Sequence, residues 1–111
     1  MSSGESGTFA RANGARGEAA FSVDGQALVL RPSFEALVAA EEELGPLFAL
    51  VERAAEGGLK VAEMAALFWH CLAEPQCCPR ERIGAAIAES GLAKVTPVLK
   101  VLLTQILQGR V

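Results

Sequence analysis

The residues best suited to chemistry in this chain are one histidine and three cysteines that lie within nine positions: His70, Cys71, Cys77 and Cys78. Three thiols and an imidazole make up the ligand set of a structural zinc site. Their spacing argues against such a site, because the chain has neither a C-x2-C pair nor an H-x3-H pair. We therefore expect no metal and no other cofactor, with Cys71 buried in the core and the other two thiols in a loop.

A catalytic pair of cysteine and histidine is the second chemical possibility. Such a pair needs a thiolate beside an oriented base. His70 directly precedes Cys71, and neighbouring residues of a helix diverge by about 100°, so we expect these side chains to point apart. The chain also lacks a glycine-rich phosphate loop, a G-x-S-x-G elbow and a metalloprotease signature. The sequence thus predicts no catalytic residue and no enzymatic activity.

A run of three carboxylates, Glu41-Glu42-Glu43, is the last candidate for acid–base work or cation binding. Runs of this kind are typical of a solvated helix face, which is how we interpret Glu42 and Glu43. Glu41 lies three and four residues after two apolar positions and is therefore expected to turn toward the apolar side, where a carboxylate needs a partner. We expect it to accept from backbone N–H groups at the start of the next helix, or to pair with Arg31.

The helix that carries these carboxylates is predicted to begin where the hydrophobic period changes from two to about three and a half. Residues 28–31 alternate as in a half-buried strand, and Pro32 ends the strand because it has no N–H to donate. Ser33 is a candidate N-cap, and Gly45-Pro46 ends the helix. The residues expected on its inner side are Phe34, Leu37, Val38, Glu41 and Leu44.

Before this helix, Asp24-Gly25 predicts a β-hairpin, since both residues tolerate the positive φ of a type I′ turn. The strands are expected over residues 18–23 and 26–31. Counting outward from the turn, the facing pairs are Val23 with Gln26, Phe21 with Leu28, and Ala19 with Leu30. A lone hairpin is barely stable in water, so its apolar face must pack on helices.

Further helices are predicted over residues 47–56, 60–73 and 80–90, the last with Ile83, Ala86 and Ile87 inward. A final helix is expected to start near Thr96, with Pro97 in its first turn. The fold class is therefore α+β: an N-terminal β-hairpin packed on a bundle of about four to five short α-helices.

The final helix is apolar over more of its circumference than one core stripe needs. It is either a terminal helix laid across the bundle or partly an interface. If it is an interface, the candidate partner-binding residues are Leu99, Leu102, Leu103, Ile106 and Leu107.

Length and composition indicate one domain over residues 18–109, after a disordered tail at residues 1–17 that is rich in Gly, Ser and Ala. With 10 Lys and Arg against 13 Asp and Glu, the net charge is −3, and no segment carries the basic stripe of a nucleic-acid binder. No apolar run is long enough to span a membrane or typical of a secretion signal. An odd number of cysteines fits a reducing compartment, so we expect a cytoplasmic protein.

Several motifs follow one another in a distinctive order. They are Arg16-Gly17-Glu18, the turn Asp24-Gly25, the block Leu30-Arg31-Pro32-Ser33-Phe34-Glu35-Ala36-Leu37, Glu41-x-x-Leu44-Gly45, Gly57-Gly58 before an alanine-rich helix, and Ser90-Gly91-Leu92. As an ordered set, they resemble the small tail proteins of gene transfer agents and related tailed phages. That family is classed with the phage tail assembly chaperones and is also labelled a tail tube component. The first ten residues and the Cys77-Cys78 loop lie outside the resemblance.

The resemblance implies a non-enzymatic protein of tail assembly. It would bind the tape-measure protein or tail tube subunits and keep their apolar segments from aggregating. Separately from the resemblance, a homo-oligomer is expected if the final helix is an interface. One alternative is a structural subunit retained in the particle. Another is a small helical regulatory adaptor, which the missing basic face disfavours.

Overall fold

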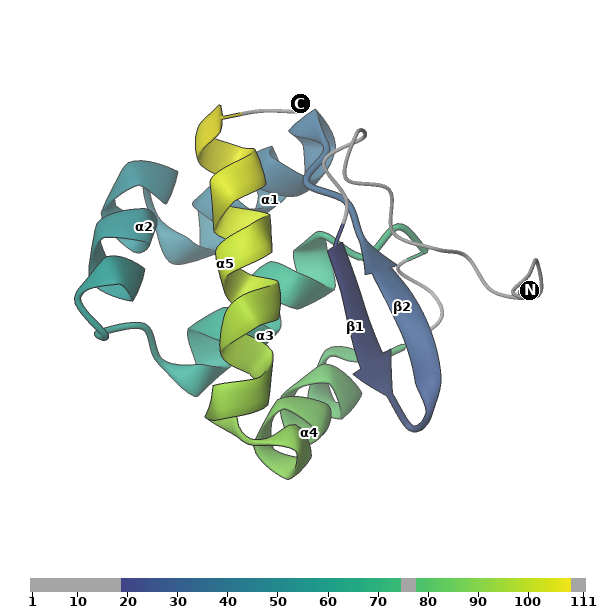
Figure 1. Ribbon diagram of the computed structural model, residues 1–111. Coiled ribbons are helices and arrows are strands. Elements are labelled where there is room, and N and C mark those ends of the chain that lie inside the picture. Colours follow the sequence, from purple (N-terminus) through teal and green to yellow (C-terminus); the bar gives the residue numbers. More distant parts are fainter. Residues whose placement is uncertain (1–18, 75–77, 109–111) are drawn as a thin grey trace.

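The computed structural model describes residues 19–74 and 78–108 (Figure 1). The predicted tail at 1–17, the first residue of the predicted domain, Glu18, and the loop residue Cys77 lie outside the described residues. The elements are β1 (Ala19–Val23), β2 (Gln26–Leu30), α1 (Phe34–Leu44), α2 (Leu47–Ala55), α3 (Val61–His70), α4 (Arg80–Ser90) and α5 (Leu92–Gln108). An N-terminal hairpin followed by helices confirms the predicted α+β class.

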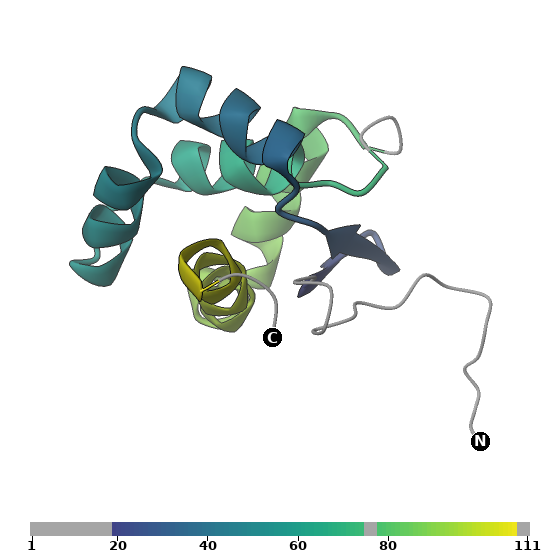
Figure 2. The same cartoon turned by 90° about the horizontal axis from the view of Figure 1, so that it is seen from above.

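The helix α3 lies at the centre of the molecule. Viewed from above, α1 passes on one side of α3 and α5 on the other, while the hairpin and α2 lie at opposite ends (Figure 2). The helix α4 packs against α3 and leads directly into α5 (Figure 1). Because both flanks of α3 are covered, five consecutive residues at its middle are buried: Met64, Ala65, Ala66, Leu67 and Phe68.

The hairpin has the predicted register and turn. Phe21 faces Leu28, and the pairs on either side follow in step. Asp24 and Gly25 have φ of 53° and 79°, the left-handed conformation that a type I′ turn requires. The turn is also tied to α4, because Arg82 donates to the Asp24 carboxylate.

The third helix ends at His70, earlier than the predicted residue 73, because the chain after it pairs with β2. The Arg31 N–H donates to the Cys71 carbonyl at 2.6 Å, and the Ala73 N–H donates to the Val29 carbonyl at 3.0 Å. Leu72 thereby forms a β-bridge with Leu30. The outer edge of β2 is covered, a contact between distant segments that helical periodicity does not reveal.

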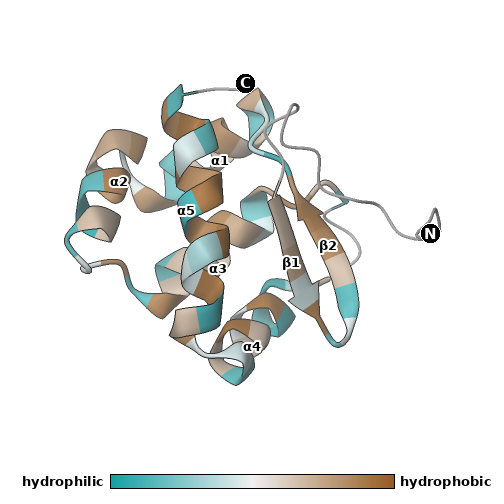
Figure 3. Cartoon of the chain, in the orientation of Figure 1, coloured by the Kyte–Doolittle hydropathy of each residue, from teal (hydrophilic) through white to brown (hydrophobic). Residues whose placement is uncertain are grey.

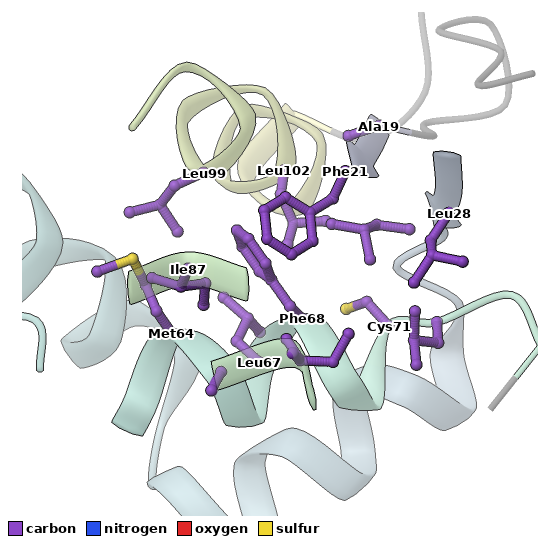
Figure 4. Close-up of a cluster of buried hydrophobic side chains, with 14 of the residues drawn as sticks. Ala19, Phe21, Leu28, Met64, Leu67, Phe68, Cys71, Ile87, Leu99 and Leu102 are labelled. Atoms are coloured by element: carbon purple, nitrogen blue, oxygen red, sulfur yellow. The ribbon is translucent and has the colours of Figure 1, made fainter. Parts of the chain in front are cut away.

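The core forms where the hairpin, α3, α4 and α5 meet. Phe21 and Phe68 make an edge-to-face pair with ring centroids 5.2 Å apart (Figure 4). Ile83, Ala86 and Ile87 are buried, as predicted for α4, and Cys71 is buried as well. The side chains without solvent exposure include Leu30, Leu67, Phe68, Ile83, Ile87, Val95 and Leu102.

The predicted inner side of α1 is wrong for three of its five residues. Phe34 is 78% exposed and Val38 38% exposed, whereas Ala36 and Ala40 are buried. The small side chains allow α1 to lie close to α3, which rotates the large apolar residues outward. Glu41 is exposed too, not on the apolar side, although Leu37 and Leu44 pack partly against the core.

The predicted start of the last helix is also wrong, since α5 begins at Leu92 and Pro97 lies inside it. Gly91, with φ of 87°, ends α4, and its carbonyl accepts from the Val95 N–H at 3.3 Å, so α5 begins at once. The proline removes one backbone hydrogen bond, but the added turn buries Val95 completely. The Thr96 hydroxyl donates to the Leu92 carbonyl at 2.7 Å in that turn.

Candidate protein interface

The side chains of His70 and Cys71 point in different directions and contact different parts of the molecule. His70 Nε2 lies 2.8 Å from Glu43 Oε1, whereas Cys71 points into the core (Figure 4). Burial raises the pKa of the Cys71 thiol to about 12, so the thiol stays neutral near pH 7. Within residues 19–74 and 78–108, no group of three or more His, Cys, Asp or Glu side chains is arranged to hold a metal ion.

Glu43 joins three helices and is not merely part of a solvated face. Its second carboxylate oxygen accepts from Arg80 Nη1 at 2.6 Å, and the Arg80 guanidinium lies over the Trp69 ring, 4.6 Å from its centroid. The hydrogen bonds from Arg80 and then from His70 hold the pKa of the Glu43 carboxyl below its usual range. The partners are 27 and 37 residues away in sequence, so no local pattern predicts this structural role.

Glu41 caps the next helix, which confirms the first of its two predicted roles. The Leu47 N–H donates to Glu41 Oε2 at 3.1 Å. The preceding residue, Pro46, occupies the N-cap position and offers no side-chain hydrogen bond. The carboxylate therefore replaces a missing cap and also faces the positive end of the α2 dipole.

A third carboxylate, Glu63, holds α2 against the start of α3. It accepts from the Lys60 N–H at 2.9 Å and from Arg53 Nη1 at 2.8 Å. These two contacts, with the backbone bond first, lower the pKa of the Glu63 carboxyl. Glu41, Glu43 and Glu63 thus join helices to one another.

Exposed apolar side chains are the surface feature that the fold leaves unexplained. The most exposed are Phe34 and Phe48, at 78% and 77%, and the others are Leu107, Leu92, Val101, Val61 and Val38. All seven lie in helices rather than in loops. Apolar and polar bands alternate along α5 (Figure 3). Exposed apolar side chains that lie next to one another on a helix face are typical of surfaces that bind other proteins.

The five predicted partner-binding residues of α5 divide into two groups. Leu99 and Leu102 are 8% and 0% exposed and point into the core (Figure 4), where a partner does not reach them. Leu103 and Ile106 pack partly against the core, and Leu107 is 52% exposed. Partner binding through the last three residues stays a prediction.

Sequence reasoning missed Phe34 and Phe48 as surface residues. Phe34 follows the N-cap Ser33, whose hydroxyl accepts from the Ala36 N–H at 3.2 Å, so the helix start was predicted correctly. Its exposure depends on which side of α1 packs against α3. In the sequence, the feature that indicates this side is the pair of small residues Ala36 and Ala40, spaced four residues apart on the side opposite Phe34.

Comparison with known protein families gives a match over nearly the whole chain. A family model described as "Phage tail tube protein, GTA-gp10" matches residues 16–109. No curated protein and no solved structure matches the chain. None of the helices in the described ranges has the length and apolar character to cross a membrane.

Proposed function

Because the chain belongs to the gene transfer agent tail protein family described as phage tail tube protein GTA-gp10, we propose that it acts in tail assembly by binding another tail protein and performs no catalysis. The family is a structural one, which supports a role in binding. The same match favours a tail protein over the regulatory adaptor that the sequence alone left open.

The proposed partner is the tape-measure protein or a tail tube subunit, bound before and during polymerisation of the tail. An apolar stripe on a partner helix would pack against the last two turns of α5, where Leu103 and Ile106 are half-buried and Leu107 is exposed. The observation that carries this proposal is the family match together with this apolar surface. Covering the partner's apolar segment would keep it from aggregating in the cytoplasm until the tail forms.

Co-expression with the tape-measure protein, followed by affinity capture, tests the proposal. Leu107→Glu places a charge in the proposed contact and is expected to reduce capture at least tenfold without unfolding the chain, since Leu107 is exposed. Gln108→Glu adds the same charge about 100° around the helix and should leave capture unchanged. If the Leu107→Glu variant captured the tape-measure protein as well as the wild type does, the end of α5 would not be part of the interface.

The description of the family as a tail tube protein favours a second candidate, a structural subunit retained in the finished particle. Quantitative mass spectrometry of purified particles separates the two roles. A retained subunit is expected in a fixed ratio to the other tail proteins, whereas an assembly chaperone is expected to be absent from particles and present in cell extracts.

A further inference from the structure

Charge is unevenly distributed over the described chain. Residues 34–56, which include α1 and α2, carry six acidic side chains and one basic side chain, a net charge of −5. The helix α5, residues 92–108, carries two basic side chains, Lys94 and Lys100, and no acidic side chain, a net charge of +2. One part of the molecule is therefore electrostatically complementary to another part of a second copy.

The outer faces of α1 and α5 carry stripes that match in spacing as well as in charge. On α1 the stripe is Phe34, Val38 and Glu42, and on α5, taken in the reverse direction, it is Leu107, Leu103 and Lys100. Both stripes are exposed except for the half-buried Leu103. At a rise of about 1.5 Å per residue, the stripes span about 12 Å and about 10.5 Å, so their ends coincide within about one residue.

We propose that α1 of one copy packs antiparallel against α5 of a second copy. Phe34 then contacts Leu107, Val38 contacts Leu103, and Glu42 lies opposite Lys100. Neither Glu42 nor Lys100 forms an ion pair with another described residue, so both are available for this contact. Antiparallel packing also places the opposite ends of the two helix dipoles side by side.

The two stripes cannot meet within one molecule, because α1 and α5 lie on opposite sides of α3 (Figure 2). The contact is consequently head-to-tail, and each copy keeps one free stripe at each end for the next copy. Repetition of such a contact closes into a ring or continues as an open chain. A single pair of short helices buries less than the ~1,200 Å² of a stable interface, so association is expected to depend strongly on concentration.

The proposed pairing of α1 with α5 is tested with charge-reversal variants. Their self-association is measured by sedimentation at increasing protein concentration. The wild-type chain is expected to associate, while Glu42→Lys and Lys100→Glu should each weaken association at least tenfold, because each sets like charges against each other. In a 1:1 mixture of these variants, every junction again joins opposite charges, so association should return. Glu56→Lys makes the same charge change beyond the stripe, on an exposed residue at the end of α2, and should associate like the wild type.

A wild-type chain that stays monomeric at all concentrations would overturn the proposal, and so would a mixture that fails to associate. Equal loss of association in the Glu56→Lys control would attribute the effect to net charge and would overturn it as well. The second copy would cover Leu103 and Leu107, which the proposed function assigns to the tail-protein partner, so the two contacts would compete for α5. The measurement uses the chain alone, so this competition does not enter it. A chain that captures that partner but never associates with itself would refute this inference and leave the proposed function standing.

Discussion

Two regions of the molecule use the same residue types in opposite ways. In the region formed by the hairpin with α3, α4 and α5, Phe21 and Phe68 are buried and pack edge to face. In the region formed by α1 and α2, Phe34 and Phe48 are almost fully exposed. In the first region the two phenylalanines stabilise the fold. In the second region they are exposed and available for contact with other molecules.

The attachment of the two regions differs accordingly. The buried residues of α1 are the small Ala36 and Ala40, and α2 buries Leu50. The partly buried Leu37, Leu44 and Leu47 also pack against the core, and polar contacts through Glu43 and Glu63 complete the attachment. Since exposed polar contacts stabilise less than buried apolar surface, we expect α1 and α2 to open more readily than the region around α3.

The largest expected effect comes from Phe68→Ala, which breaks the first region. Phe68 has no solvent exposure and contacts Phe21, so its truncation leaves a cavity under the hairpin and α5. We expect the free energy of unfolding to fall by about 3–5 kcal/mol, measured by urea denaturation. A loss below about 1 kcal/mol would show that this region is not the centre of stability.

Alkaline pH should weaken the same region through Cys71. Burial raises the pKa of its thiol from the ordinary value of 9.0 to about 12, so the unfolded chain loses this proton first. The stabilisation is complete below pH 9 and is lost as the pH rises toward 12, by at most ~1.4 kcal/mol per pH unit. Urea midpoints at several pH values should show a steeper alkaline decline for the wild type than for Cys71→Ala. Parallel declines would contradict the assignment.

The attachment of the second region begins at the cap of α1. Ser33→Ala removes the hydroxyl that accepts from the Ala36 N–H, which should cost about 1 kcal/mol. Hydrogen exchange is expected to rise first in the opening turns of α1, while protection of α3 changes little. A uniform loss of protection over both helices would instead mean that the two regions unfold as one unit.

Glu43→Gln tests the polar junction between the regions. Because the folded pKa of Glu43 is lowered, its contribution is present above about pH 4.5 and is lost as the pH falls through the folded pKa. The carboxylate is partly exposed, so we expect an effect of only about 0.5 kcal/mol at pH 7. The difference between wild type and variant should shrink as the pH falls below 4.5 and vanish once the folded carboxyl is protonated, and a difference that does not shrink would contradict an electrostatic origin.

What could be predicted from the sequence follows the range of the interactions involved. The turn at Asp24-Gly25, the register of the hairpin and the cap at Ser33 were predicted correctly, because each depends on neighbours within a few residues. The bounds of α4 were predicted correctly as well, with a stop at Gly91. Local conformational preference is enough to fix elements of this kind.

The errors arose where distant segments decide the outcome. Leu72 was predicted in the helix but forms a β-bridge with Leu30, 42 positions earlier in the chain. Pro97 was predicted in the first turn of α5 but lies inside the helix, because the added turn buries Val95. On α1, Phe34, Val38 and Glu41 were predicted to face inward but are exposed, because close packing against α3 favours the small side chains of the two alanines. The side of α1 that packs against α3 also determines which side chains are exposed for the proposed interface. Hydrophobic periodicity alone therefore does not predict this interface.

The smallest expected effect on stability sharpens the contrast most. Phe34→Ala truncates a side chain of the same type as Phe68, but because Phe34 is 78% exposed we expect a change within about 0.5 kcal/mol. Its self-association should nevertheless weaken, since Phe34 is the apolar end of the α1 stripe. Phe48→Ala is the matched control, because Phe48 is equally exposed and lies on α2 outside that stripe. This substitution should leave both the free energy of unfolding and the self-association unchanged. If Phe48→Ala weakened association as much as Phe34→Ala, exposed aromatics in general would drive self-association, and the specific pairing of α1 with α5 would be wrong.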